Sequence, residues 1–466
     1  MTRRTALLAA LSTAFAATVA AQQPASTAVA IVGVTVINPG SDSAPATNQT
    51  ILIDGGRIQA VGSAATVRVP PGARVVNGRG KFAIPGLWDM HVHFMNTGPS
   101  ALPVFVALGV TSVREMGGYI DSTRAWQARM KAGTLVGPRI ITAGPILESP
   151  RYLEGVRDRS ARLDDRLAAR VLPYRISVGN AADARRALDS LKTLGVDFAK
   201  VRTTASPEAY FAILREGRRV GLPVVGHPPA GVSLADASDS GQKSIEHGFY
   251  PPLSALPPDQ RQSLYRRFAD NHTWYTPTLV VSRAVMLPAD SAAREIFGKP
   301  ASRDERRPYA SRWLLEWWRM QVDERIADST TPYALYAEAY QSSTNDVRGM
   351  WAAGVQLLAG TDAGSVLVYP GFSLHEELRL LVHDAGLTPR LALRTATSAP
   401  ARFFGMEETL GAIAPLHIAD IVLLDASPLA NITNTRRIFA VIQGGHVFAR
   451  KDLDGVLRDA RTAAER

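Results

Sequence analysis

The chain has 466 residues, of which 46% are hydrophobic and 20% charged, a composition typical of a folded globular protein with room for more than one domain. It contains no cysteine, which excludes disulfides, thiolate metal sites and a cysteine nucleophile. The net charge of +10 comes from scattered arginines without a Lys/Arg block, which favours a solvated basic surface and argues against a nucleic-acid partner.

The first 21 residues have the pattern of a secretory signal peptide. Arg3 and Arg4 precede an apolar run from Ala6 to Ala20, and small residues at its end supply a cleavage site. An uncleaved anchor is the alternative, but the run is short for a membrane span of about 20 residues. We therefore expect an exported protein, periplasmic or secreted, with no membrane span after cleavage.

Both ends of the remaining chain show the alternating pattern of β-strands. The strand candidates are 29–37, 50–54, 57–61, 418–424, 438–442 and 446–449. The Gly55-Gly56 pair between two of them is a hairpin signal. Two β-rich ends around a different middle predict one discontinuous β-sandwich domain, built from residues 22–80 and 411–466.

The middle of the chain, residues 81–410, alternates short apolar strands with helical segments such as 181–194 and 206–219. The strand candidates are 82–90, 110–115, 139–143, 197–202, 223–226, 244–246, 274–280 and 355–360. Eight strands alternating with helices predict an α/β fold, a (β/α)8 TIM-like barrel with insertions. A doubly wound open sheet is disfavoured because no Gly-x-Gly-x-x-Gly turn follows a first strand.

One long segment, residues 251–350, is predicted to be an insertion that carries helices and several tryptophans. In a barrel, such an excursion after a strand either covers the carboxyl ends of the strands or only adds an outer layer of helices. The sequence leaves both roles open.

Polar side chains gather where the predicted strands end, which is where barrel enzymes build their sites. His91 and His93 are two residues apart, so an extended strand directs both imidazoles to the same side. Each strand-end residue alone has an ordinary structural explanation, such as a hydrogen bond, a turn or an ion pair. Together they predict a metal site. The six candidates are His91, His93, Lys200, His227, His247 and Asp362.

The sequence resembles the amidohydrolase superfamily of metal-dependent hydrolases, and within it the imidazolonepropionase-like and prolidase-like amidohydrolases. The resemblance covers nearly all of residues 28–450. The matching motifs are Pro-Gly-Leu-Trp-Asp-Met-His-Val-His (85–93), Gly-Val-Thr-Ser-Val-Arg (109–114), Gly-Val-Asp-Phe-Ala-Lys-Val (195–201), Ser-Ile-Glu-His-Gly (244–248) and Gly-Thr-Asp-Ala-Gly (360–364).

The resemblance implies a binuclear site for divalent metal ions, most commonly Zn²⁺. One ion would be held by His91, His93 and Asp362. The other, more exposed ion would be held by His227 and His247. Relatives often carry a second histidine two residues after the strand-five ligand, where this chain has proline. That departure alters the pocket and removes none of the implied ligands.

The resemblance also implies that Lys200, carbamylated by CO2, bridges the two ions. Carbamylation requires the neutral form of the lysine amine, and an apolar strand favours this form because burial disfavours the charged one. The implied chemistry is hydrolysis of a C–N amide bond by a metal-bridged hydroxide, with Asp362 as the proton shuttle.

The expected substrate is a small-molecule amide or peptide, either a dipeptide such as Xaa-Pro or an N-acyl amino acid. Bulky aryl amides, esters or lactones are an alternative, and a non-catalytic zinc-binding scaffold is an alternative of another class. Tyr174 is a candidate substrate contact, and Arg151, Arg202 and Tyr275 are further candidates for binding a carboxylate. Homo-oligomers are common among relatives, and the sequence leaves the oligomeric state of this chain open.

Overall fold

The computed structural model describes residues 28–163, 166–247, 253, 256–327 and 333–465. The predicted signal peptide, residues 1–21, lies outside these ranges. Within them, none of the helices combines the length and the apolar character that crossing a membrane would take.

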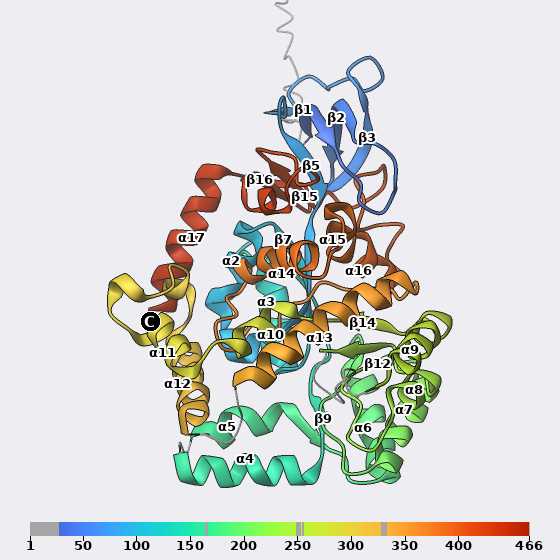
Figure 1. Ribbon diagram of the computed structural model, residues 1–466. Coiled ribbons are helices and arrows are strands. Elements are labelled where there is room, and N and C mark those ends of the chain that lie inside the picture. The colour runs from blue at the N-terminus through green and yellow to red at the C-terminus, as the bar shows by residue number, and fades with distance from the viewer. Residues whose placement is uncertain (1–27, 164–165, 248–252, 254–255, 328–332, 466) are drawn as a thin grey trace, which may run out of the picture.

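A mixed sheet at one end of the molecule, at the top of Figure 1, takes its strands from both ends of the chain. Its order is β17-β16-β15-β5-β1-β2-β3, and β4 pairs with β1. The strands are β1 (Val29–Val36), β2 (Ala46–Asp54), β3 (Arg57–Ser63), β4 (Arg74–Asn77), β5 (Phe82–Pro85), β15 (Ile421–Leu424), β16 (Ile438–Gln443) and β17 (His446–Ala449). The predicted domain boundaries after residues 80 and 410 stay a prediction.

The predicted strand 82–90 is divided between two sheets. Its first part, β5, pairs antiparallel with β15 in the terminal sheet, whereas β6 (Leu87–Val92) begins a parallel sheet. Gly86 joins them, and a Cβ on this residue would lie 2.1 Å from Oγ1 of Thr111, so only glycine fits there. The carboxyl end of β6 therefore points away from the terminal sheet.

The middle of the chain has the predicted α/β fold, and its strands form two parallel sheets where a single barrel sheet was expected. The first is β6-β7-β8 and the second is β10-β9-β11-β12-β13-β14. The remaining strands are β7 (Val110–Glu115), β8 (Arg139–Thr142), β9 (Ile146–Glu148), β10 (Arg175–Ser177), β11 (Ala199–Val201), β12 (Val224–Gly226), β13 (Ser244–Glu246) and β14 (Trp274–Thr276). All but one, β10, are buried along their whole length or nearly so, as expected for parallel strands covered on both faces.

Backbone hydrogen bonds link both edge strands of the β6-β7-β8 sheet to the rest of the α/β unit. On one side, the amide of Leu358 donates to the carbonyl of Tyr275 at 3.0 Å, and the amide of Met90 donates to Ala359 at 2.9 Å. On the other side, the amide of Asp197 donates to Thr142 at 3.0 Å. The predicted strand 355–360 forms one isolated bridge, Leu357 with Tyr275, and belongs to neither of the two described sheets.

Helices occupy the intervals between the strands. They are α1 (Phe94–Thr97), α2 (Leu102–Ala107), α3 (Ile120–Lys131), α4 (Pro150–Leu163), α5 (Arg166–Val171), α6 (Ala181–Leu194), α7 (Pro207–Val220), α8 (Leu234–Asp239), α9 (Pro258–Asp270), α10 (Leu279–Met286), α11 (Ala289–Phe297), α12 (Arg312–Ala327), α13 (Tyr333–Ala352), α14 (Phe372–His383), α15 (Pro389–Thr395), α16 (Ser398–Phe403) and α17 (Arg450–Ala464).

The two clearest predicted helices are confirmed, and their ends follow local chemistry. The Asn180 side chain caps α6 by accepting from the amides of Ala182 and Asp183, and a left-handed Gly195 ends the helix. Helix α7 has a serine cap, proline in its first turn and glycine after its last residue.

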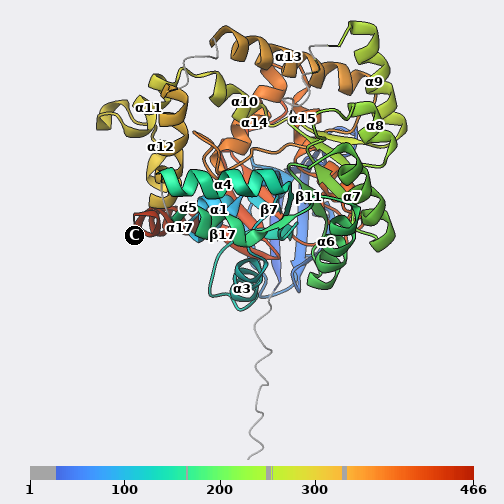
Figure 2. The same ribbon diagram turned by 90° about the horizontal axis from the view of Figure 1, so that it is seen from below.

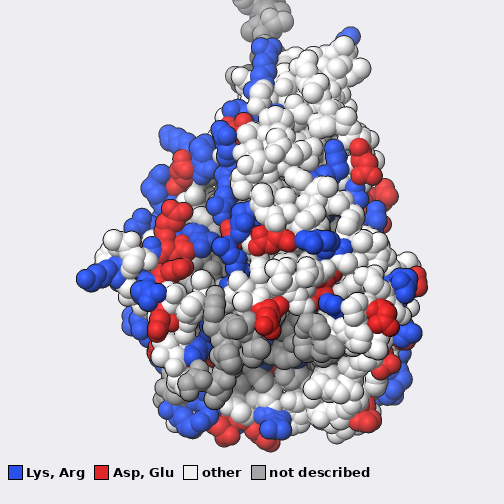
Figure 3. Space-filling model, in the orientation of Figure 1, with Lys and Arg blue, Asp and Glu red and all other residues white. Residues whose placement is uncertain are grey.

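Helices α4 and α5 lie at the end of the molecule opposite the terminal sheet (Figure 1), and α4 crosses in front of the strands when the molecule is viewed from that end (Figure 2). Because β6 points toward this end, α4 and α5 lie on the side where the parallel strands terminate. On the face seen in Figure 3, basic and acidic side chains are interspersed, with a denser basic group on the left.

Candidate metal centre

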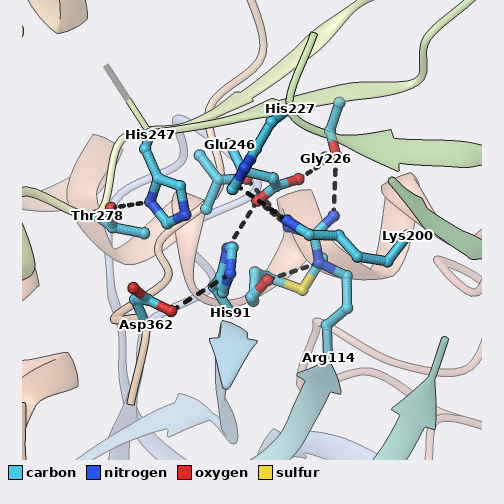
Figure 4. A network of polar contacts seen from close by, with 12 residues as sticks. His91, Arg114, Lys200, Gly226, His227, Glu246, His247, Thr278 and Asp362 are labelled. Atoms are coloured by element: carbon cyan, nitrogen blue, oxygen red, sulfur yellow. Dashed lines mark hydrogen bonds and ion pairs between the residues drawn. The ribbon is translucent and has the colours of Figure 1, made fainter. Parts of the chain in front are cut away.

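The six strand-end side chains predicted to form a site meet in one cluster at the carboxyl ends of the parallel strands, and five of them are labelled in Figure 4. The ring centroids of His91 and His93 are 5.3 Å apart, and those of His91 and His247 are 4.6 Å apart. The His227 ring lies 5.1 Å from the His247 ring, and its Nε2 is 3.3 Å from Nζ of Lys200.

The donor atoms of this cluster fit a divalent cation. One donor atom each from His91, His247 and Asp362 lie within 4.8 Å of one another. Oδ1 of Asp362 is also 3.2 Å from Nε2 of His93 and 3.5 Å from Nε2 of His91. Imidazole nitrogens with a carboxylate oxygen form a typical ligand set for zinc and neighbouring transition metals.

Two of the histidines are oriented by a second hydrogen bond. Nδ1 of His91 lies 3.0 Å from Oε2 of Glu246, and Nδ1 of His247 lies 2.7 Å from Oγ1 of Thr278. A carboxylate can only accept, so Nδ1 of His91 carries the proton. Fixing Nδ1 in this way directs Nε2 toward the cluster, which is how outer partners commonly orient metal-ligating histidines.

Glu246 also contacts the cluster, although no sequence pattern singled it out. It directly precedes His247, and strict strand alternation would place the two side chains on opposite faces. His247 instead has a left-handed backbone with φ of 66°, which breaks the alternation and brings both side chains to the site. The adjacency of Glu and His was visible in the sequence, but the local backbone was not.

Arg114 completes a buried polar network with Glu246, His91 and Asp89. Its Nη2 donates to Oε2 of Glu246 at 2.7 Å, and its Nε donates to the carbonyl of Met90 at 2.6 Å. Burial alone would raise the pKa of Glu246, but the Arg114 guanidinium and His91 hold it below its usual range. Glu246 is therefore anionic and accepts from His91.

Asp89 ties the first strand to the loop that carries Asp362. Its carboxylate accepts from the amide of Thr361 at 3.0 Å, from the hydroxyl of Thr361 at 2.7 Å and from the amide of His91 at 3.2 Å. Burial raises the pKa of Asp89 to about 7. The side chain thus connects two segments that each contribute to the cluster.

Three residues of the site other than glycine have left-handed backbone conformations. These are His247 with φ of 66°, Thr278 with φ of 47° and Asp362 with φ of 60°. Such residues are uncommon and cost of order 1–3 kcal/mol each when strained, so the surrounding contacts must hold them in place. Their concentration at one cluster is typical of a functional site.

Lys200 is deeply buried, with a side chain about 1% exposed. Burial lowers its pKa to about 8, although the carboxylates of Glu246 and Asp362 oppose the shift. Gly226 on the neighbouring strand permits this packing, since a Cβ there would lie 1.9 Å from the carbonyl oxygen of Val201 and 3.0 Å from Cδ of Lys200.

Helix α12, from the predicted insertion, braces two loops of the site. The indole N–H of Trp313 donates to the carbonyl of Met95 at 3.2 Å, two residues after His93. The indole N–H of Trp318 donates to the carbonyl of Gly364 at 3.1 Å, two residues after Asp362. Helix α12 therefore contacts two loops that carry residues of the cluster.

Tyr174 packs against aromatic and basic neighbours that are not part of the six-residue cluster. It is buried, its ring centroid is 5.1 Å from that of Tyr119, and the Arg175 guanidinium lies 4.9 Å from the ring. Of the carboxylate candidates, Tyr275 is only 1% exposed and Arg151 is on the exposed surface of α4. Arg202 directly follows the strand of Lys200.

Comparison with known proteins gives consistent matches. The model of the Amidohydrolase family matches residues 82–447. The chain is 25% identical to ochratoxinase from Aspergillus niger over 495 aligned positions, which cover 93% of this chain and 89% of that relative.

Two solved structures extend the comparison. Bottromycin amidohydrolase superposes with a TM-score of 0.69 at 23% identity, covering 95% of this chain and 91% of that chain. A prolidase complexed with N-methylphosphonate-L-proline superposes with a TM-score of 0.67 at 24% identity, covering 91% of this chain and 100% of that chain. At these identities the solved structures show a shared fold.

Proposed function

Because the chain belongs to the Amidohydrolase family, we propose that it is a metal-dependent hydrolase that cuts a C–N amide bond in a dipeptide such as Xaa-Pro or in an N-acyl amino acid. The observation that carries the proposal is the convergence, in one buried cluster, of every strand-end side chain that the sequence singled out. Those residues are His91, His93, Lys200, His227, His247 and Asp362.

We propose that this cluster holds two divalent cations, most favourably Zn²⁺. His91, His93 and Asp362 would hold one, and His227 with His247 the other. When bound, such cations activate water and polarise a substrate carbonyl. The chemistry of the donor set supports this assignment, since nitrogen and carboxylate ligands suit zinc and the chain has no thiolate to offer.

Lys200 is the proposed bridging residue, carbamylated by CO2. An ammonium group cannot ligate a cation, whereas a carbamate offers two anionic oxygens. Burial of Lys200 lowers its pKa to about 8, which increases the neutral amine available for carbamylation near neutral pH. Its Nζ already lies 3.3 Å from Nε2 of His227, so the modified group would reach the cluster.

Asp362 is proposed to move the proton. Its Oδ1 faces the His91 and His93 nitrogens, while its Oδ2 accepts from the Ser365 hydroxyl at 2.8 Å. Burial alone would raise the pKa of Asp362, but the hydrogen bond from His93 and the nearby histidines hold it well below its usual range. The carboxylate would accept the proton of the attacking water and deliver it to the leaving amine.

We also infer that the two parallel sheets are two arcs of one (β/α)8 barrel. The hydrogen bonds of Leu358, Met90 and Asp197 support closure, because they connect β6 and β8, the two edge strands of the first sheet, toward β14 and β11 of the second. We also propose, from the sequence pattern alone, that residues 1–21 are a signal peptide and that the mature protein is periplasmic or secreted.

A second candidate is hydrolysis of an aryl amide. The similarity to ochratoxinase, which extends over 93% of this chain, favours it. Both candidates need the same metal centre and differ in the groups on either side of the amide.

The test is a hydrolysis screen on the purified protein with zinc and bicarbonate present. The panel contains dipeptides, N-acyl amino acids, aryl amides, aryl esters and lactones, and the metal content is measured in parallel. We expect close to two equivalents of zinc and turnover of an amide. A protein that holds zinc but cuts nothing in the panel would support the scaffold alternative, and a metal-free protein would contradict the proposed centre.

A further inference from the structure

A group of side chains beside the metal centre carries a charge that the proposed hydrolysis does not use. We call it the mouth cluster, and it consists of Glu148, Tyr152, Arg175, Arg202 and Thr203. It lies where β9 and β11 end and α4 begins, on the side of the strands that α4 crosses (Figure 2).

Two arginines of the mouth cluster share one carboxylate. Glu148 is fully buried and pairs with Arg175 and with Nη1 of Arg202, the latter at 3.2 Å. Its other oxygen accepts from the hydroxyl of Thr203 at 2.6 Å. One carboxylate balances only one guanidinium, so these side chains together retain one positive charge.

The remaining charge is presented by Arg202. The side chain of Arg175 is 8% exposed, whereas that of Arg202 is 36% exposed. The Arg202 guanidinium also lies 4.3 Å from the centroid of the Tyr152 ring, which holds its plane in position. A planar guanidinium fixed in this way is suited to pairing with a carboxylate through two parallel hydrogen bonds.

Arg202 lies two residues after Lys200, which belongs to the proposed metal centre. The amide of Arg202 donates to the carbonyl of Leu147 at 3.1 Å, so the extended pairing of β11 continues through this residue. Lys200 and Arg202 are two residues apart, so their side chains leave the same face, and the two residues span about 6.6 Å of extended chain. That span matches one residue of substrate, at most about 3.6 Å, together with an ion-pair contact within about 4 Å. An amide carbonyl placed beside Lys200 would therefore put the carboxylate of the adjoining amino acid near Arg202.

We infer that Arg202, held by Glu148 and Tyr152, binds the α-carboxylate on the amine half of the substrate. The enzyme then selects amides in which the leaving amine is an amino acid, namely N-acyl amino acids and dipeptides, over neutral amides, esters and lactones. This inference rests on the proposed function, because it places the substrate carbonyl at the metal centre.

The competing explanation is that Arg202 only balances Glu148. In that case its loss would lower the free energy of unfolding and would slow all substrates equally. Binding of a substrate carboxylate predicts a different result, an effect confined to ligands that carry the carboxylate. Substrate pairs that differ only in this group separate the two explanations.

The experiment uses the zinc-loaded full-length protein and a panel of N-acetyl and N-benzoyl amino acids with different side chains. Each is paired with its decarboxylated counterpart, for example N-benzoyl-L-phenylalanine with N-benzoylphenethylamine. Affinity is measured by calorimetry and kcat/KM by amine release. The variants are Arg202→Gln, Arg202→Lys and, as a matched charge control, Arg185→Gln on the exposed surface of α6.

We expect the wild type to favour the carboxylate member of at least one pair, and Arg202→Gln to reduce that preference by about 30-fold, mainly through KM, as for a lost hydrogen bond to a charged group. Arg202→Lys should restore part of the preference, and Arg185→Gln should keep all of it. A wild type without any preference, or an Arg202→Gln protein that keeps it, would overturn the inference. Binding without hydrolysis would contradict the proposed function and leave the carboxylate result readable.

Discussion

The buried polar network and the mouth cluster are both built around an arginine paired with a glutamate, yet they differ in exposure. In the network, Arg114 and Glu246 are both 0% exposed, and each Arg114 nitrogen has a partner. In the mouth cluster, Glu148 is equally buried, but Arg202 is 36% exposed and one positive charge is left over.

The difference separates two tasks. A fully buried ion pair cannot meet a substrate, but it fixes the orientation of His91, and removing one partner leaves an uncompensated charge that costs about 3–5 kcal/mol. A partly exposed cation costs little to desolvate and can bind an incoming anion. The buried network therefore supports the chemistry, and the mouth cluster supports selection of the substrate.

The largest effect is expected from Lys200→Ala. It removes the proposed bridging ligand, so it should abolish metal binding and the hydrolysis of every substrate. Arg202→Gln, only two residues away, should slow the hydrolysis of carboxylate-bearing substrates alone. Metal content and turnover are measured with and without short carboxylic acids, which should restore part of both. Full activity of Lys200→Ala without any added acid would contradict the proposal that Lys200 bridges the metal ions.

Glu246→Gln should lower both stability and metal affinity. It leaves the Arg114 charge buried without a counter-ion, so the free energy of unfolding should fall by about 3–5 kcal/mol. It also weakens the support for His91, which should reduce metal affinity by about 10–100-fold. Denaturant unfolding of the metal-free protein and competition with a chelator measure the two effects.

The control is the double variant Arg114→Met with Glu246→Gln, in which neither charge remains. It should lose less unfolding free energy than the single variant, because no unpaired charge stays buried. An equal loss of unfolding free energy in the two proteins would mean that the unpaired Arg114 charge does not cause the destabilisation.

A pH experiment sharpens the comparison, because Glu115 is a buried carboxylate without an arginine. Burial raises its pKa from 4.5 to about 8, opposed only by hydrogen bonds from Thr142 and Gly117. Among the described residues, its Oε1 has no hydrogen-bond partner. Because the pKa in the folded state is the higher one, the contribution of Glu115 to stability is complete below pH 4.5 and is lost as the pH rises through 8.

Glu115→Gln should remove this dependence. The free energy of unfolding of the metal-free wild type, relative to the variant, should fall by about 1.4 kcal/mol per pH unit within that window. Chemical denaturation at several pH values measures it. Parallel curves for the two proteins would show that Glu115 does not stay protonated in the fold.

The smallest effect is expected from Trp318→Phe. The substitution keeps the aromatic ring but removes the N–H that binds the carbonyl of Gly364, a hydrogen bond worth about 1 kcal/mol. Metal affinity should therefore fall by about fivefold, with little change in substrate preference. Trp88→Phe, at a core tryptophan packed on Phe404, controls for loss of an indole elsewhere. An equal loss of metal affinity in both variants would count against bracing by α12.

Much of this site was predictable because its signals are local. The ends of apolar segments are visible in the sequence, and most of the six side chains follow such segments, while Lys200 is the polar residue within one of them. Arg114 could not be found in this way, because its partner Glu246 lies on a different strand 132 residues away and no local pattern links them. The division of the first strand at Gly86 was also missed, since it depends on which sheet each half pairs with.

The terminal sheet has a consequence for the order in which the chain folds. Ile84 on β5 pairs with Val422 on β15, 338 positions later (422 − 84). At roughly 5–20 residues per second, a ribosome needs about 17–70 s to produce the second partner after the first. During that interval one edge of β5 has no neighbour. Chains cut short before β15 would keep that edge open, and they are the species we expect to pair with one another and aggregate.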